Sequence, residues 1–336
     1  MTSVVHSAKG WGTDLARGWN RFWFATADPH MLALIRILAG SMLFYTHLVW
    51  ALDLLDFLGP NSWLPRQLAR DLHRGSYAWS YLWYVESPAV LWALHSVALV
   101  ILAMFTAGLF TRITSVLAWL ITVSYCHRLT GAFFGLDPVN SMLAMYLMVG
   151  PSGAVYSVDH WLAARRTGRP SPPAQATVTA NIAIRLIQLH MCVIYLFGGI
   201  SKMRGQLWWD GSAVWYAIAN LEYQSWDITW LINYPWLIAL LTHITVIWET
   251  YYCVLVWLKA TRPITLLLAV CVHSGIALFL GMITFGLVMI IGNLAFVSPA
   301  TVRTCLSWRP GKQSRAGEQV SEPRRDRHTR RSRKLR

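Results

Sequence analysis

The composition of this 336-residue chain is that of a protein embedded in a membrane. Hydrophobic residues make up 55% and charged residues 13%, whereas charged residues average about 25% of a soluble domain. The chain also holds 19 tryptophans, and Trp gathers where an apolar ring meets a wet interface. This composition excludes soluble enzymes, DNA-binding domains and secreted disulfide scaffolds.

The formal net charge of +14 does not indicate nucleic-acid binding, because the basic residues lie outside the apolar runs. Twelve Lys and Arg stand against three Asp and Glu between Arg303 and Arg336. A segment of this kind cannot bury enough apolar surface to fold. We expect residues 303–336 to form a disordered, basic cytoplasmic tail that contacts membrane lipid. Binding of a nucleic acid or a partner by this tail is the alternative.

Residues 1–28 show the pattern of a helix that lies in the membrane interface. Trp11, Leu15, Trp19 and Phe22 recur at helical spacing, with charged residues between them. An amphipathic helix of this kind buries its apolar face among lipid headgroups. The segment has no uninterrupted apolar stretch, so we do not expect a signal peptide.

Eight apolar runs follow in chain order. They cover approximately residues 31–52, 87–110, 113–127, 138–156, 179–200, 232–258, 263–281 and 283–300. A bilayer core takes about 20 helical residues, so the third and fourth runs are short. The uncharged stretch 263–302 would form a helix of about 60 Å if unbroken, and we expect it to fold back near Gly281. The sequence predicts an all-α bundle of about eight transmembrane helices within residues 29–302, with seven to nine remaining possible.

The loop charges predict the orientation of this bundle. With eight spans and a cytoplasmic N-terminus, the inner loops carry every basic cluster: Arg112, then Arg165, Arg166 and Arg169, then Lys259 and Arg262, then the tail. The long outer segments 53–86 and 201–231 are mixed or acidic. The positive-inside rule therefore favours cytoplasmic N- and C-termini. A bacterial cytoplasmic membrane fits this topology best.

Ionisable residues within spans indicate function by default, because they are unfavourable in lipid. We place Arg36, Arg185 and Glu249 near the inner side, where they could form a charge pathway. Alternatively, an arginine pairs with Glu249 and fixes the helix register.

Three histidines, His190, His243 and His273, are expected at mid-depth, one on each of three spans. They could bind a metal, relay protons or bond neighbouring groups. Since no two share a span and the five cysteines stand singly, we predict no metal site.

The outer side of the predicted bundle holds Asp137, Lys202 and Asp210. Lys202 ends the fifth run after two glycines, and a Trp-Trp-Asp-Gly segment follows it. Glycines allow close helix packing, and paired tryptophans anchor an interface. Lys202 is either a lysine that extends to the interface or a partly desolvated amine that acts as a base.

Several of these segments resemble a known family. The segments are Arg185-Leu-Ile-Gln188, Ile194-Tyr-Leu-Phe-Gly-Gly-Ile-Ser-Lys202 and Trp209-Asp-Gly-Ser-Ala-Val-Trp215, with Tyr156-Ser-Val-Asp159, Trp248-Glu249 and the stretch from Gly281-Met282 through Pro299 as weaker matches. Across residues 20–300 the chain resembles the HTTM (horizontally transferred transmembrane) family, which is related to the vitamin K-dependent γ-glutamyl carboxylases. The resemblance implies a reaction centre at the outer face, where Lys202 is the candidate base that deprotonates a reduced quinone.

Two departures separate this chain from those carboxylases. Their Asn-Asn-His motif is replaced by Gly135-Leu-Asp137-Pro-Val-Asn140, which has no histidine. Their long lumenal domain, which holds the polypeptide substrate, has no counterpart after Pro299. A separate subunit would have to supply that function.

Three functions remain open on this basis. The first is an HTTM-family membrane enzyme, carboxylase-related, that acts on a quinone or lipid with Lys202 as base and with Asp137 and Asp210 near it. The second is a non-catalytic accessory protein for maturation or export of a small secreted peptide, with a periplasmic partner. The third is a transporter or proton pathway through the arginines, Glu249 and the histidines.

Overall fold

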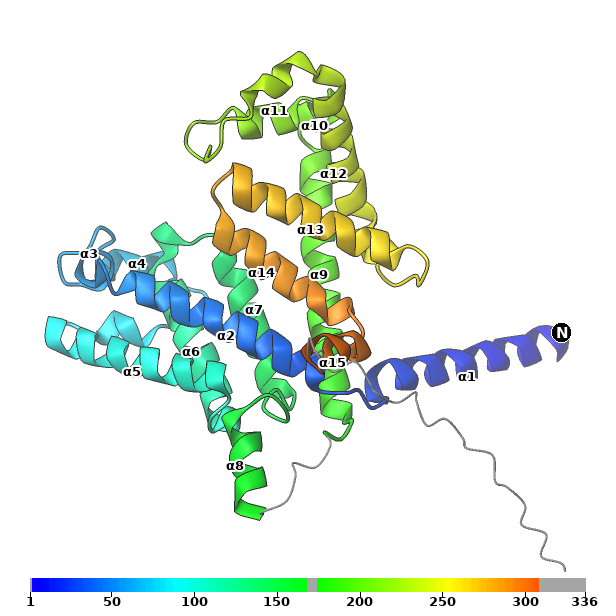
Figure 1. Ribbon diagram of the computed structural model, residues 1–336, viewed down its shortest axis with the longest axis horizontal. Coiled ribbons are helices and arrows are strands. Elements are labelled where there is room, and N and C mark those ends of the chain that lie inside the picture. The colour runs from blue at the N-terminus through cyan, green and yellow to red at the C-terminus, as the bar shows by residue number, and fades with distance from the viewer. Residues whose placement is uncertain (1, 168–173, 308–336) are drawn as a thin grey trace, which may run out of the picture.

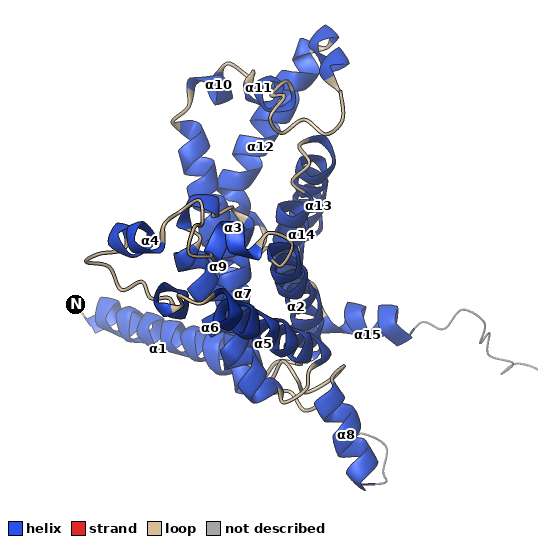
Figure 2. Cartoon of the chain, turned by 90° about the vertical axis from the view of Figure 1, so that its left-hand side faces the viewer, coloured by secondary structure: helices blue, strands red, loops and turns tan. Residues whose placement is uncertain are grey.

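The computed structural model describes residues 2–167 and 174–307, with side chains described from Trp11 to Thr304 within these ranges. Their regular structure is entirely helical, and no β-strand occurs among them (Figures 1 and 2). Five helices in this part of the chain are long and apolar enough to span a membrane. They are α2 (His30–Trp50), α5 (Pro88–Ala107), α9 (Val178–Met203), α12 (Pro235–Leu255) and α13 (Arg262–Phe279). The chain is an all-α membrane protein.

Three further helices fall on apolar runs but are shorter. They are α6 (Thr111–Arg128), α7 (Leu136–Val149) and α14 (Ile283–Asn293). They contain 18, 14 and 11 residues, fewer than the about 20 that cross a bilayer core. A count of eight spans therefore depends on these three helices.

The remaining described helices connect or flank this bundle. They are α1 (Thr2–Phe24), α3 (Leu54–Leu58), α4 (Arg66–Leu72), η1 (Tyr81–Tyr84), η2 (Thr130–Ala132), α8 (Val158–Thr167), α10 (Gln206–Trp209), α11 (Ala213–Ile218), η3 (Thr229–Asn233), η4 (Leu294–Phe296) and α15 (Pro299–Ser307). Helix α1 extends away from the bundle in both views (Figures 1 and 2). Its Trp11, Leu15 and Trp19 are exposed. An interfacial position of α1 stays a prediction.

The spans pack as neighbouring pairs. Helix α2 lies beside α5, α6 beside α7, α9 beside α12 and α13 beside α14, while α7 contacts α9 and joins the two halves. In Figure 1, α9 crosses α13 and α14 at a steep angle rather than running parallel to them. One continuous core of apolar side chains fills the space between these helices.

The expected fold-back near Gly281 is confirmed. Helix α13 ends at Phe279 and α14 begins at Ile283. Between them Gly281 has a φ of 68°, a backbone conformation that glycine adopts without strain. The uncharged stretch thus becomes two antiparallel helices.

A small lobe follows α9 at one end of the molecule. Helices α10, α11 and η3 lie beside the first half of α12 (Figures 1 and 2). Ile218, Leu231 and Ile238 form a second, separate apolar cluster there. Helix α12 therefore begins well beyond the end of α9 (Figure 1).

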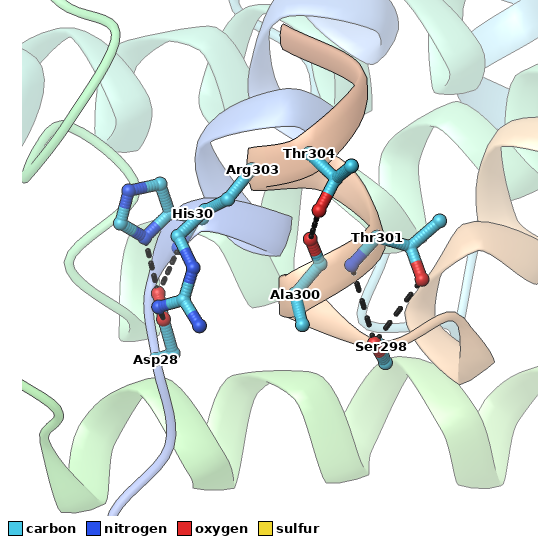
Figure 3. A network of polar contacts seen from close by, with 7 residues as sticks. All are labelled: Asp28, His30, Ser298, Ala300, Thr301, Arg303 and Thr304. Atoms are coloured by element: carbon cyan, nitrogen blue, oxygen red, sulfur yellow. Dashed lines mark hydrogen bonds and ion pairs between the residues drawn. The ribbon is translucent and has the colours of Figure 1, made fainter. Parts of the chain in front are cut away.

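The chain after α14 returns to the start of α2. Asp28 accepts hydrogen bonds from the backbone N–H and the ring of His30 and forms an ion pair with Arg303 of α15 (Figure 3). Burial alone would raise the pKa of Asp28, but these bonds and charges lower it overall. Residues 303–307, expected to begin the tail, are helical, and the tail from residue 308 lies outside the described residues.

Candidate functional site

Lys202 and Glu249 form an ion pair between α9 and α12. Lys202 Nζ lies 2.6 Å from Glu249 Oε2, and the two side chains are 28% and 9% exposed. Gly199 makes this approach possible, because a Cβ there would meet the backbone of Thr250 at 2.7–2.8 Å. The two glycines before Lys202 therefore serve the packing of α9 on α12.

The pair joins the end of α9 to a point well along α12. Glu249 follows Pro235, the first residue of α12, by 14 positions, which is about 21 Å of helix, whereas Lys202 is the next-to-last residue of α9. The sequence predicts Lys202 at the outer side and Glu249 near the inner side, but the two side chains are in contact. The alternative in which an arginine pairs with Glu249 is wrong, because its partner is Lys202.

An aromatic ring adds to the environment of Lys202. Its Nζ lies 5.4 Å from the ring centre of Trp208, a distance at which the π face attracts a cation. Trp209 donates from Nε1 to the carbonyl of Met203, 2.6 Å away. Both tryptophans therefore contact the end of α9: Trp209 bonds Met203, and the ring of Trp208 lies beside Lys202.

A buried hydrogen-bond network lies next to this pair on the same two helices. Tyr195 precedes Lys202 by two helical turns, and Tyr252 follows Glu249 by one turn. Asn293 of α14 donates to Tyr195 Oη at 2.8 Å and accepts from Tyr252 Oη at 2.5 Å. Tyr195 Oη in turn shares a hydrogen bond of 2.8 Å with His273 Nε2. The sequence does not single out the two tyrosines and the asparagine, because they are uncharged polar residues that only the packing of the helices brings together.

His273 lies at one end of this network. Its Nε2 contacts Tyr195 Oη, and its Nδ1 is buried with no hydrogen-bond partner among the described residues. Because a hydroxyl oxygen both donates and accepts, the tautomer of the ring decides which of the two groups is the donor.

The three histidines predicted at mid-depth do not meet. His190 bonds Tyr146 Oη at 3.0 Å, and His243 bonds the carbonyl of Trp209 at 3.3 Å in the lobe. Only His273 belongs to the network beside Lys202. Within the described ranges, no group of three His, Cys, Asp or Glu side chains is placed to hold a metal ion.

Arg36 anchors the opposite end of the bundle. Its guanidinium donates to the carbonyls of Ser152 and Tyr156, at 2.7 and 2.5 Å. Asp159 accepts from the backbone N–H groups of Phe110 and Thr111, each at 2.8 Å, and so caps the N-terminus of α6. The Tyr156–Asp159 segment therefore has a structural role.

Arg185 also lies apart from Glu249, and its Nη1 donates to Gln188 Oε1 at 3.0 Å. The polar residues predicted as one intramembrane network are thus divided into separate groups.

Asp137 and Asp210 each accept hydrogen bonds from a residue two or three positions away in the sequence and not from Lys202. Asp137 Oδ2 accepts from the N–H of Phe134 at 2.8 Å and borders a cavity of about 20 Å³ between α2, α6 and α7. Asp210 Oδ1 accepts from Ser212 N and Oγ, and these bonds lower the pKa of its exposed carboxyl. A catalytic role for either carboxylate stays a prediction.

Comparisons of the chain with family models, with curated proteins and with solved structures found no match. The fold and the site define a class: an all-helical membrane protein with a Lys–Glu ion pair between two spans. Membership of the HTTM family stays a prediction from the motifs quoted above.

Proposed function

We propose that this chain is a membrane enzyme of HTTM type that removes a proton from a reduced quinone or a lipid, with Lys202 as the base. The contact between Lys202 Nζ and Glu249 Oε2 carries this proposal. The sequence identifies only the base, and the contact with Glu249 supports a route for its proton.

The paired groups can exchange a proton without a net change of charge. When the ammonium of Lys202 passes a proton to the Glu249 carboxylate, a neutral amine and a carboxylic acid result. The amine then accepts the proton of a substrate hydroxyl and leaves the substrate as an anion beside an ammonium group. The short contact between the two groups lets the proton pass directly from one to the other.

The surroundings of Lys202 fit an apolar substrate that carries a hydroxyl group. Trp208 offers a ring face close to Nζ, and Val193 and Phe197 expose apolar side chains on the preceding turns of α9. Neither Lys202 nor Glu249 lines the cavity beside Asp137, the cavity at the start of α6 or the cavity at the start of α9. A quinone or lipid would therefore reach Lys202 from the lipid side of α9 and α12.

The proposal includes eight spans with both termini in the cytoplasm of a bacterial cell. One cavity is bordered together by Ala27, Asn181, Arg262 and Pro299. These residues come from the starts of the first, fifth and seventh expected spans and the end of the eighth. In an eight-span chain that crosses the membrane in alternating directions, these four ends lie on the same side. Their position around one cavity supports this topology.

Turnover of a reduced quinone tests this function. The protein is reconstituted in lipid vesicles and supplied with a prenylated hydroquinone and oxygen. Because oxygen oxidises the hydroquinone anion faster than the neutral hydroquinone, the loss of hydroquinone beyond that in protein-free vesicles reports removal of the proton. We expect Lys202→Met to abolish the turnover, and Lys259→Met, an exposed lysine, to retain it. Equal turnover in both variants would contradict a base at Lys202.

An accessory role is the second candidate, because both charged atoms of the pair already have partners. In that case the pair only holds α9 to α12, and the protein assists maturation or export of a small secreted peptide with a periplasmic partner. Vesicles would then show no hydroquinone turnover even with the unaltered protein.

A further inference from the structure

A second cavity lies at the end of the bundle where α9 begins. It has a volume of about 280 Å³ and is bordered by α9, by the connection between α12 and α13, and by the segment from η4 to α15. Arg185 and Arg262 both line it. Lys202 does not line this cavity, so a role for the cavity does not depend on the proposed function.

Arg185 is held in place by aromatic rings and an amide. Its guanidinium carbon lies 4.4 Å from the ring centre of Phe22 and 5.6 Å from that of Trp257. Gln188 accepts from Nη1 and donates to the carbonyl of Ala295. The Nε of Arg185 is buried without a hydrogen-bond partner, which leaves donor capacity unused.

Arg262 approaches the same cavity from the other side. Its Nε and Nη2 donate to the carbonyls of Val256 and Trp257, at 2.8 and 3.1 Å. These are carbonyls just past the end of α12, so they fix the guanidinium but do not neutralise it. Trp257 thus contacts both arginines.

The two cations have no carboxylate partner among the described residues. Asp28, the acid of the neighbouring segment, pairs with His30 and Arg303 (Figure 3), and Glu249 of α12 pairs with Lys202. Like charges at one site disfavour each other, and a partly buried charge without a counterion is unfavourable. A bound anion would relieve both effects.

We propose that this cavity binds a phosphate group through Arg185 and Arg262. Guanidinium groups match phosphate oxygens in pairs of parallel hydrogen bonds. Phosphate also carries enough charge to offset two arginines. The cavity lies at the basic end of the bundle, where an anionic lipid can place its headgroup. The phosphate is that of an anionic phospholipid or of a soluble phosphate compound, and the two sources share this chemistry.

Lipid binding to the purified full chain tests the site. Native mass spectrometry in detergent measures the affinity for phosphatidylglycerol, with Arg185→Gln/Arg262→Gln as the variant. Arg165→Gln/Arg166→Gln is the matched control, because it removes two exposed charges from the same predicted side. We expect the first variant to bind about tenfold more weakly and the control to bind like the unaltered protein.

Measurements of Tm distinguish a phospholipid from a soluble phosphate and show whether each variant is folded. Phosphatidylglycerol or inorganic phosphate is added, and the rise in Tm is measured for each. A rise with the lipid alone supports a headgroup site, and a rise with inorganic phosphate supports a site for a soluble phosphate. Arg185→Lys/Arg262→Lys, which retains the charges, should recover part of the rise. If the glutamine variant folds and gains as much Tm as the control with either ligand, the proposal is overturned.

Discussion

Lys202 and Glu249 each occupy a place where an isolated charge is unfavourable. Glu249 is only 9% exposed, so removal of its partner leaves a charge that water cannot solvate. The pair as a whole need not stabilise the fold, since an apolar pair of similar size often gives a protein of equal stability. Each charge, however, is tolerated in its buried position only because the other is beside it.

A double-mutant cycle measures this dependence. We expect Lys202→Met to lower the free energy of unfolding by about 3–5 kcal/mol. Adding Glu249→Leu should recover much of that loss, because no charge is then left unpaired. Thermal unfolding of the four proteins in detergent gives the coupling. Strictly additive losses would show that the two groups do not interact.

The residues of the site were found in the sequence, but their partners were not. Lys202 and Glu249 stand out because charges are rare in apolar runs. Hydropathy reports depth along one helix and not which helices face each other, so Glu249 was assigned to an arginine. Tyr195 and Asn293 carry no charge, and only the packed helices reveal their network.

At the scale of helices, glycine at position 199 sets the distance between α9 and α12. A Cβ there would collide with the backbone of Thr250, which cannot move without the helix. By contrast, a Cβ at Gly275 of α13 has its nearest neighbour at an ordinary 3.9 Å from Phe279.

These two glycines form a matched pair of substitutions. We expect Gly199→Ala to destabilise the protein by about 1–3 kcal/mol through overpacking. Gly275→Ala should be neutral or slightly stabilising, since alanine favours helix. Tm values of both variants check this, and equal effects would mean that α9 and α12 do not pack closely at position 199.

Helix α6 depends on the carboxylate of Asp159 at its N-terminus. Burial alone would raise the pKa of Asp159, but hydrogen bonds from Thr111 and Phe110 and the charge of Arg36 lower it overall. A group with a lowered pKa stabilises the fold above its ordinary pKa and loses this contribution as the pH falls through the lowered value.

The Asp159→Asn variant tests this cap. At pH 7 we expect it to be less stable by about 1–2 kcal/mol. The difference from the unaltered protein should shrink below about pH 4, where the aspartate itself becomes neutral. Unfolding curves at several pH values measure it. A difference that is constant from pH 7 to pH 3 would exclude an ionised cap.

The order of helices was largely predictable, whereas the lobe was not. The lengths of the apolar runs predict the helices α2, α5, α9, α12 and α13. The uncharged stretch 263–302 is too long for a single span, which predicts the turn at Gly281. The lobe from α10 to η3 contains only short helices whose position depends on packing against α12. The apolar runs alone therefore do not show that α12 begins beyond the end of α9.

For the whole molecule, loop charge predicts which end faces the cytoplasm. Cysteine substitution on a cysteine-free background can test the direction. We expect Tyr77→Cys, in an exposed loop, to react with a membrane-impermeant maleimide in intact cells. Lys259→Cys, between α12 and α13, should react only after the membrane is opened. The reverse result would invert the proposed topology.

In the proposed mechanism, Glu249 takes up the proton that frees Lys202 to act as a base. Infrared difference spectra of the reconstituted protein, recorded before and after addition of a reduced quinone, report this directly. We expect a carboxylic acid C=O band to appear in the unaltered protein and to be missing in Glu249→Gln. If the quinone binds and Glu249 stays an ionised carboxylate, the pair is structural and the proposed mechanism is wrong.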